Sequence, residues 1–290
     1  MSIKTKGCCT QRLRMKIDSH QHFWKYNPQR DGWIDESMKV IQADFSPLDL
    51  EPHLQHHKID GCIAVQADQS EEETEFLLEL AAEYTFVKGV VGWIDLRAVN
   101  VEERLEYFSQ NSFFKGVRHI VQAEKEDFLL SADFQKGIST LRQFKLPYDI
   151  LIFPNQLESA IQMVNQFPDQ EFILDHIAKP YIKKQILQPW KSLIHELAKA
   201  QNVSCKISGL ITEADLKNWD AGEIEPYLDV VFNAFGEDRV LFGSDWPVCL
   251  LAGDYDEVVS LVSNYTVDFS SKAKEKLFGA NAARIYNIKE

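Results

Sequence analysis

The feature that most constrains the fold of this sequence is an eightfold alternation of two hydrophobic patterns. Short runs rich in β-branched and aromatic residues are separated by segments in which apolar residues recur every three or four positions. The eight runs are residues 15–23, 61–67, 87–96, 114–122, 147–153, 171–176, 203–209 and 240–246. Strands that alternate with helices predict a parallel sheet with helices packed outside it.

The clearest predicted helix has both a start signal and an apolar stripe. Ser70 and Glu73 have the spacing of a capping box, in which the hydroxyl and the carboxylate each accept a hydrogen bond from an unpaired amide. The stripe that follows contains Phe76, Leu77, Leu80, Ala81 and Tyr84. Stripes of the same period occur at residues 157–164 and 190–198, so helices are also expected there.

Eight strand–helix units fit a closed (β/α)8 TIM barrel, which typically has about 250 residues. A doubly wound open sheet is the alternative, but no glycine-rich phosphate turn follows the first strand. No Pro/Gly/Ser-rich linker divides the 290 residues, so residues 15–290 are predicted to form a single domain. Residues 1–14 lack the apolar segment of a secretory signal and are predicted to be a disordered N-terminal extension.

Composition narrows the classes of partner. The 31 Lys and Arg residues against 44 Asp and Glu residues give a net charge of −13, which argues against binding to nucleic acid or an anionic membrane. No apolar run approaches the ~20 residues needed to cross a bilayer. The five cysteines are odd in number and form no C-x-x-C pair, which is typical of reduced thiols in a cytoplasmic protein. The sequence leaves the oligomeric state open and is compatible with a homo-oligomer.

Polar residues stand near the carboxyl ends of six of the predicted strands, where the active site of a (β/α)8 barrel lies. A barrel interior is normally apolar, so this concentration is hard to explain by packing. Alternate residues of a strand share a face, so the two histidines of the first strand can share a ligand. The candidates are His20, His22, Gln66, Arg118, His119, His176, Lys206 and Asp245.

Each candidate also has a purely structural explanation. One histidine of the first strand could bond a neighbouring strand, His176 could pair with Asp175 in the core, and Asp245 could cap the next helix. Arg118 and His119 are adjacent, so they point to opposite faces and only one of them can face the mouth. Aromatic faces beside polar groups suit a sugar ring, which makes Trp24, Trp33 and Trp246 candidates for substrate binding.

Six segments together resemble the amidohydrolase superfamily, of the amidohydrolase-2 type, and within it the sugar-lactonase branch. The resemblance runs from about residue 15 to the end of the sequence, and its segments are D-S-H-Q-H-F-W, G-V-V-G-W-I-D-L, G-V-R-H-I-V-Q, L-D-H-I-A-K-P, C-K-I-S-G-L and F-G-S-D-W-P-V-C. Members of this branch hydrolyse L-fuconolactone, L-rhamnonolactone and related aldonolactones. The resemblance implies a (β/α)8 barrel and ester hydrolysis in carbohydrate metabolism, such as fucose catabolism.

One departure bears on the cofactor. Metal-dependent relatives usually add a ligand from strand four or a histidine from strand five, and residues 148–153 contain no histidine. His20, His22 and Asp245 alone would supply three ligands, enough for a catalytic zinc site with a bound water, and His176 or His119 could add a fourth. Some members of the branch work without a metal. Both a single divalent metal, such as zinc, and a metal-free site therefore remain open.

The resemblance suggests a hydrolysis mechanism. Asp245 is the candidate general base that takes a proton from water. Arg118 or His119, with His20 and His22 or a metal that they hold, would stabilise the oxyanion, and His176 would protonate the leaving oxygen or orient the substrate carbonyl. Gln66, Lys206 and the three tryptophans would bind a small sugar lactone. Two alternatives remain: a metal-dependent decarboxylase or other amidohydrolase acting on a small carboxylic acid, and a non-catalytic sugar-binding protein.

Overall fold

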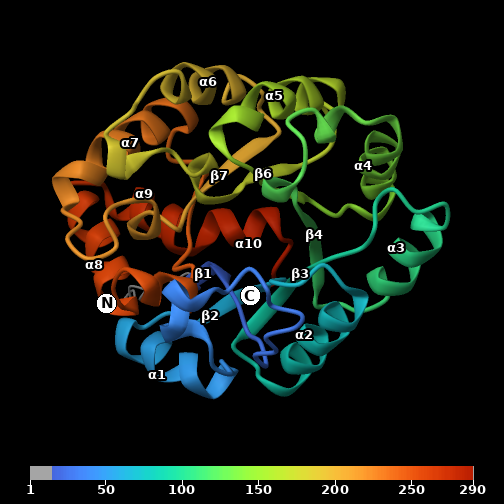
Figure 1. Ribbon diagram of the computed structural model, residues 1–290, viewed down its shortest axis with the longest axis horizontal. Helices are drawn as coiled ribbons and strands as arrows, with labels where there is room; N and C mark the ends of the chain where they lie inside the picture. The colour runs from blue at the N-terminus through green and yellow to red at the C-terminus, as the bar shows by residue number, and fades with distance from the viewer. Residues whose placement is uncertain (1–14, 290) are drawn as a thin grey trace, which may run out of the picture.

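Eight parallel strands form the centre of the molecule, which confirms the predicted (β/α)8 barrel (Figure 1). The computed structural model describes residues 15–289, so the predicted extension at 1–14 lies outside the described residues. The strands follow one another around the sheet in sequence order. They are β1 (Ile17–Gln21), β2 (Gly61–Val65), β3 (Val87–Gly92), β4 (Phe114–Ile120), β5 (Tyr148–Leu151), β6 (Phe172–Leu174), β7 (Val203–Ile207) and β8 (Val240–Phe242).

The first and last strands meet, so the sheet curls into a barrel and the open-sheet alternative is wrong. Gln21 forms a parallel bridge with Trp246. The His22 amide donates to the Trp246 carbonyl at 2.7 Å, and the Asp245 amide donates to the His20 carbonyl at 2.8 Å. These bonds bring the polar ends of β1 and β8 together.

Helices α1 to α8 surround the barrel, one after each strand, and α9 and α10 follow α8 at the end of the described chain (Figure 1). Ser70 caps the second helix by accepting from the Glu73 amide at 3.2 Å. Only this half of the predicted capping box forms, because the Glu73 carboxylate accepts from the amides of Ala67 and Asp68. The helices are α1 (Pro47–His57), α2 (Glu71–Glu83), α3 (Val101–Ser109), α4 (Ala132–Phe144), α5 (Leu157–Gln166), α6 (Trp190–Leu197), α7 (Ala221–Phe235), α8 (Tyr255–Tyr265), α9 (Ser271–Glu275) and α10 (Asn281–Ile285).

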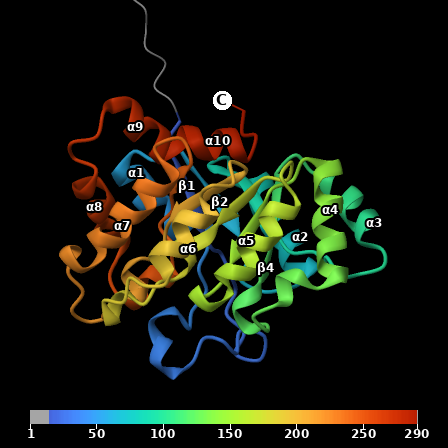
Figure 2. The same ribbon diagram turned by 90° about the horizontal axis from the view of Figure 1, so that it is seen from above.

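The two ends of the barrel are covered by different segments (Figure 2). At the amino ends of the strands, α10 packs against a buried apolar layer made of Ile17, Ile63, Val65, Val91, Ile173 and Leu241. At the opposite end lies the segment between β1 and α1, which contains Trp24 and Trp33 and the short 3-10 helix Glu36–Ile41. This segment therefore stands at the mouth, where barrel active sites form.

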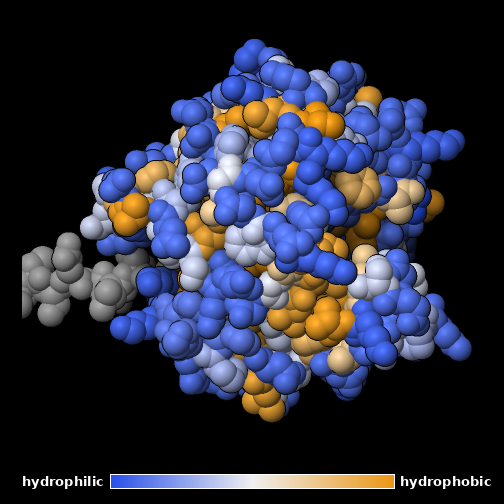
Figure 3. Space-filling model, turned by 60° about the vertical axis from the view of Figure 1, so that its left-hand side comes forward, coloured by the Kyte–Doolittle hydropathy of each residue, from blue (hydrophilic) through white to orange (hydrophobic). Residues whose placement is uncertain are grey.

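The surface seen in Figure 3 is mostly hydrophilic, with apolar side chains gathered in separate patches. Among residues 15–289, no helix is both long and apolar enough to cross a membrane.

Candidate active site

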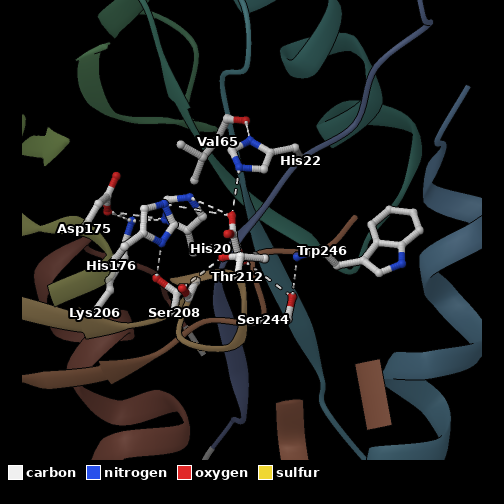
Figure 4. Close-up of polar contacts among 12 residues, drawn as sticks. His20, His22, Val65, Asp175, His176, Lys206, Ser208, Thr212, Ser244 and Trp246 are labelled. Carbon is white, nitrogen blue, oxygen red and sulfur yellow. Dashed lines mark hydrogen bonds and ion pairs between the residues drawn. The ribbon is translucent and has the colours of Figure 1, made fainter. Parts of the chain in front are cut away.

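Three imidazoles converge on one oxygen of Asp245 at the mouth end of the barrel. The Oδ1 atom of Asp245 lies 3.4 Å from Nε2 of His22, 3.8 Å from Nε2 of His20 and 3.9 Å from Nε2 of His176. All four side chains are almost fully buried. They lie at or just after the carboxyl ends of β1, β6 and β8, three strands that are far apart in the sequence and meet only in the closed barrel (Figure 4).

The backbone at two of these strand ends is left-handed, which turns the side chains toward the axis. Asp245 has a φ of 59°, and His176, Ile177, Ala178 and Lys179 have φ values of 52°, 49°, 60° and 46°. Each such residue costs roughly 1–2 kcal/mol relative to a right-handed one. The indole of Trp190 donates to the Ile177 carbonyl at 2.8 Å and helps to hold the turn. Strain of this kind is common at functional sites.

Asp18 fixes the position of β1 against the segment after β8. Its buried carboxylate accepts from the Ser244 amide at 2.9 Å, the His20 amide at 3.1 Å and the Tyr255 hydroxyl at 3.0 Å. Burial raises the pKa of Asp18 to about 6, against these hydrogen bonds, which lower it. The first residue of the D-S-H-Q-H motif is therefore structural, and it holds the histidine beside Asp245.

Hydrogen bonding fixes the tautomer of His22. Its Nδ1 lies 2.7 Å from the carbonyl oxygen of Val65, which can only accept, so Nδ1 carries the proton (Figure 4). The Nε2 lone pair then faces Asp245 Oδ1 at 3.4 Å. Two electron-rich atoms at this separation repel one another unless a cation or a proton lies between them.

The other two histidines are held neutral. Burial, followed by the charge of Lys206, moves the pKa of His20 well below its usual 6.5. Burial also moves the pKa of His176 well below that value, and its Nδ1 lies 2.9 Å from the Ser208 hydroxyl. Neutral imidazoles are the form that binds a metal.

Asp245 is ionised and has one oxygen to spare. Burial raises its pKa, but the neighbouring His176 and His22 and the charge of Lys179 outweigh burial and hold the pKa below the usual value. Its Oδ2 atom is buried and has no hydrogen-bond partner among residues 15–289. A buried carboxylate oxygen without a partner is costly, and a cation or a water would satisfy it.

These residues fit a divalent metal. His20, His176 and Asp245 each offer a ligand atom, and the three atoms lie within 4.8 Å of one another. Ligands of a tetrahedral zinc ion, with bonds of about 2.0–2.2 Å, lie roughly 3.3–3.6 Å apart. The separations of 3.4–3.9 Å around Asp245 Oδ1 are too long for good hydrogen bonds and close to this spacing.

Beneath the imidazoles lies a fully buried polar floor. Lys206 contacts Asp149 at 2.5 Å and Asp175 at 3.0 Å. Arg118 contacts Asp175 at 3.1 Å and also donates to the Gln66 side chain at 3.0 Å. The floor holds two cations and two carboxylates, so its charges balance. Lys206, predicted to bind substrate, is fully buried and lies against His20 at 3.2 Å.

The structure separates Arg118 from His119. Arg118 points into the barrel, and its NH1 lies 3.3 Å from His20 Nε2. His119 points outward and stacks on Phe128, with ring centroids 4.9 Å apart. Its Nδ1 accepts from the Trp93 indole at 3.2 Å, and its Nε2 lies 3.2 Å from Glu124. His119 is thus not among the residues gathered around Asp245.

The three predicted sugar-binding tryptophans lie in different surroundings. Trp24 is buried, donates to the Ala43 carbonyl at 2.9 Å and packs edge-on against Trp33. Trp246 is buried between Phe23 and Phe45, and its ring points away from the histidines (Figure 4). Trp33 is 42 % exposed, so it alone of the three presents a large open face.

Sequence reasoning missed Asp149 as a member of the floor and treated Asp175 only as a partner of His176. Asp175 instead lies 3.3 Å from His20 and joins both floor cations. Burial raises the pKa of Asp149 to about 6, against the charge of Lys206. Burial also raises the pKa of Asp175, but Lys206 and Arg118 outweigh it and leave the pKa lowered. The sequence did offer a signal for both residues, because Asp149 and Asp175 each lie within a predicted strand that is mostly apolar.

A family model described as "Amidohydrolase" matches residues 17–288. The chain belongs to the amidohydrolase family. It is 39 % identical to an L-fucono-1,5-lactonase from Burkholderia multivorans, over 95 % of this chain and 97 % of that protein. It is 33 % identical to an L-fucono-1,5-lactonase from Burkholderia ambifaria, again over 95 % and 97 %. The predicted resemblance to the sugar-lactonase branch is confirmed.

A solved structure of this amidohydrolase family also matches the chain. It is an amidohydrolase from Burkholderia multivorans with bound zinc, with a TM-score of 0.92 and 39 % identity, covering 95 % of this chain and 100 % of that one. The family is hydrolytic, and the histidine–aspartate cluster of this amidohydrolase is compatible with a divalent metal.

Proposed function

We propose that this amidohydrolase opens a sugar lactone to the free acid, with an aldonolactone such as L-fucono-1,5-lactone or L-rhamnonolactone as substrate. The observation that carries the proposal is the convergence of three imidazoles on Asp245, which keeps one unpartnered oxygen. The named activity of the two Burkholderia relatives supports it. The buried free thiols of Cys62, Cys205 and Cys249 support the further proposal that the enzyme is cytoplasmic.

Zinc is the cofactor we propose. His20, His176 and Asp245 would hold it, with His22 as a fourth donor, and nitrogen with carboxylate oxygen is a usual zinc ligand set. When bound, such an ion supplies a Lewis acid that polarises a carbonyl group and activates water. The backbone carbonyl of Val65 and the hydroxyl of Ser208 would keep His22 and His176 correctly oriented.

Asp245 moves the proton in this proposal. Oδ1 faces the imidazoles, so Oδ2 accepts a proton from water as the water oxygen bonds to the lactone carbonyl carbon. The tetrahedral adduct then collapses, the ring C–O bond breaks, and the leaving alkoxide takes that proton from Oδ2. The products are a hydroxy acid and the restored carboxylate. The low pKa of Asp245 ensures that it starts ionised.

The remaining candidates receive different roles. Trp33 is proposed to cover the sugar ring, and Trp24 and Trp246 to hold the mouth segment in place. Arg118 and Gln66 form the floor beside His20, and Lys206 supplies a counter-charge there. The proposal gives His119 no step in the reaction, because its partners are Trp93, Phe128 and Glu124.

The test is a pH-indicator assay of the zinc-loaded enzyme against a panel of five- and six-membered aldonolactones. L-configured sugar lactones are expected to release acid faster than the uncatalysed control. The metal-stripped enzyme, prepared with a chelator, is expected to lose activity and to recover it with zinc. Failure of the loaded enzyme to open any lactone of the panel would refute the proposed function.

A further inference from the structure

Asp175 lies directly behind His20, on the side away from Asp245. The distance from Asp175 Oδ1 to His20 Nδ1 is 3.3 Å, and both side chains are fully buried. We propose that Asp175 is the positioning residue of His20, and that it selects the tautomer with the proton on Nδ1. That tautomer leaves the Nε2 lone pair of His20 directed toward Asp245, where a divalent cation would bind. The inference rests on the metal site of the proposed function.

The hydrogen bonding of Asp175 favours this assignment. Its Oδ2 accepts from the Arg118 guanidinium at 3.1 Å. Its Oδ1 lies 3.0 Å from the Lys206 ammonium but accepts no hydrogen bond of good geometry within residues 15–289. A proton on His20 Nδ1 would supply the missing bond. Buried carboxylate oxygens generally have such a donor.

The two tautomers of His20 can be compared contact by contact. With the proton on Nδ1, the ring brings that proton to within reach of Asp175 Oδ1, which lies 3.3 Å from Nδ1, and Nε2 accepts from Arg118 NH1, also at 3.3 Å. The Nδ1 proton then also faces the Lys206 ammonium at 3.2 Å. With the proton on Nε2, Nδ1 accepts from Lys206 at 3.2 Å. The Nε2 proton would then face the Arg118 donor at 3.3 Å and reach Asp245 only at 3.8 Å. Each tautomer thus accepts one hydrogen bond and sets one donor against another, but only the first brings a proton to the unpartnered Oδ1 of Asp175.

Lys206 does not need His20 as an acceptor. Its ammonium has Asp149 at 2.5 Å and Asp175 at 3.0 Å, so two of its three protons already face carboxylates. Lys206 and Arg118 therefore both keep carboxylate partners when His20 carries its proton on Nδ1. A carboxylate behind a ligating histidine also raises the basicity of the ligand, and its loss typically weakens metal binding 10–100-fold.

The first test compares zinc binding to three proteins: the wild type, Asp175→Asn and Glu73→Gln. Affinity is measured by competition with a coloured chelator, and folding by circular dichroism. Asn presents N–H donors to Nδ1 and favours the other tautomer, so its zinc affinity is expected to fall about 10–100-fold. Glu73→Gln is the matched control, a buried carboxylate away from the site that accepts from the amides of Ala67 and Asp68. Unchanged affinity in a folded Asp175→Asn protein would overturn the inference.

The second test does not require zinc. Metal-free wild-type protein labelled with 15N-histidine is examined by long-range 1H–15N correlation, and the His20 ring is identified by its absence from His20→Asn. The expected pattern has the proton on Nδ1, and a proton on Nε2 would overturn the inference. If the wild type binds no zinc, the proposed cofactor fails, but comparing this spectrum with that of metal-free Asp175→Asn still decides whether Asp175 selects the tautomer.

Discussion

Replacing Lys206 with methionine should destabilise the enzyme more than most single substitutions. Methionine keeps much of the side-chain volume but removes a fully buried ammonium that contacts Asp149 at 2.5 Å and Asp175 at 3.0 Å. Asp175 would keep Arg118 as a counter-charge, whereas Asp149 would keep, among residues 15–289, only the Tyr286 hydroxyl. Removing one partner of a buried ion pair costs about 3–5 kcal/mol.

The loss should depend on pH in a defined direction. Burial already raises the pKa of Asp149 to about 6 while Lys206 opposes it, so losing Lys206 raises it further. An acid whose pKa is higher in the folded than in the unfolded state favours folding at low pH and penalises it as pH rises through that pKa. The gap between the wild type and Lys206→Met should therefore be small near pH 5 and largest near pH 8.

Thermal unfolding followed by circular dichroism at pH 5 and pH 8 tests this reasoning. At about 2–4 °C per kcal/mol, the melting temperature at pH 8 should fall by roughly 10 °C. The double variant Asp149→Asn/Lys206→Met should recover much of the loss, because it removes the unpaired carboxylate. Equal losses at the two pH values, or a second substitution that makes matters worse, would show that the charge balance of the floor is not the cause.

Three further variants probe the mouth of the barrel. Asp245→Asn should keep the fold and lower kcat for lactone opening by at least ~100-fold, and near-wild-type turnover would remove Asp245 as the base. Trp33→Ala should raise KM about 2–10-fold with little change in kcat, because an aromatic contact is worth about 0.5–1.5 kcal/mol. An unchanged KM would show that Trp33 does not contact the substrate. Gly209→Ala should lower both kcat and melting temperature, since φ is +62° and the new methyl group would lie 2.7 Å from His176 Nδ1. Steady-state kinetics and melting curves measure all three.

The architecture was accessible from the sequence because buried parallel strands and amphipathic helices leave different periodicities. Each of the eight predicted runs contains a strand, but the strands end earlier than predicted. β8 stops at Phe242 rather than at residue 246, and β6 at Leu174 rather than at 176. Left-handed residues end the regular pairing there, including His176 and Asp245. Hydrophobic periodicity does not reveal which non-glycine residues adopt a left-handed backbone.

Strand parity limited what could be predicted of the site. Parity predicted that Arg118 and His119 face opposite ways. Only the tertiary contacts, of Arg118 with His20 and of His119 with Phe128, show that Arg118 faces inward. Similarly, adjacency suggested a pair between Asp175 and His176. The left-handed turn directs the two side chains differently, so that Asp175 reaches His20. The pairs that matter most join different strands, and spacing along one strand carries no information on them.

The buried polar floor of the barrel has a consequence for folding during synthesis. Tyr286 follows α10 and donates to Asp149 at 2.8 Å. β1 pairs with β2 along one edge, and its other edge is closed by residues that follow β8. During synthesis the buried carboxylates and Lys206 would therefore lack a closed, dry surrounding until residues beyond 280 have left the ribosome. An unfinished chain that collapsed early would enclose charges without their partners, which is costly. Because the buried charges need partners from the end of the chain, the native barrel can form only when almost the whole of the described chain has emerged.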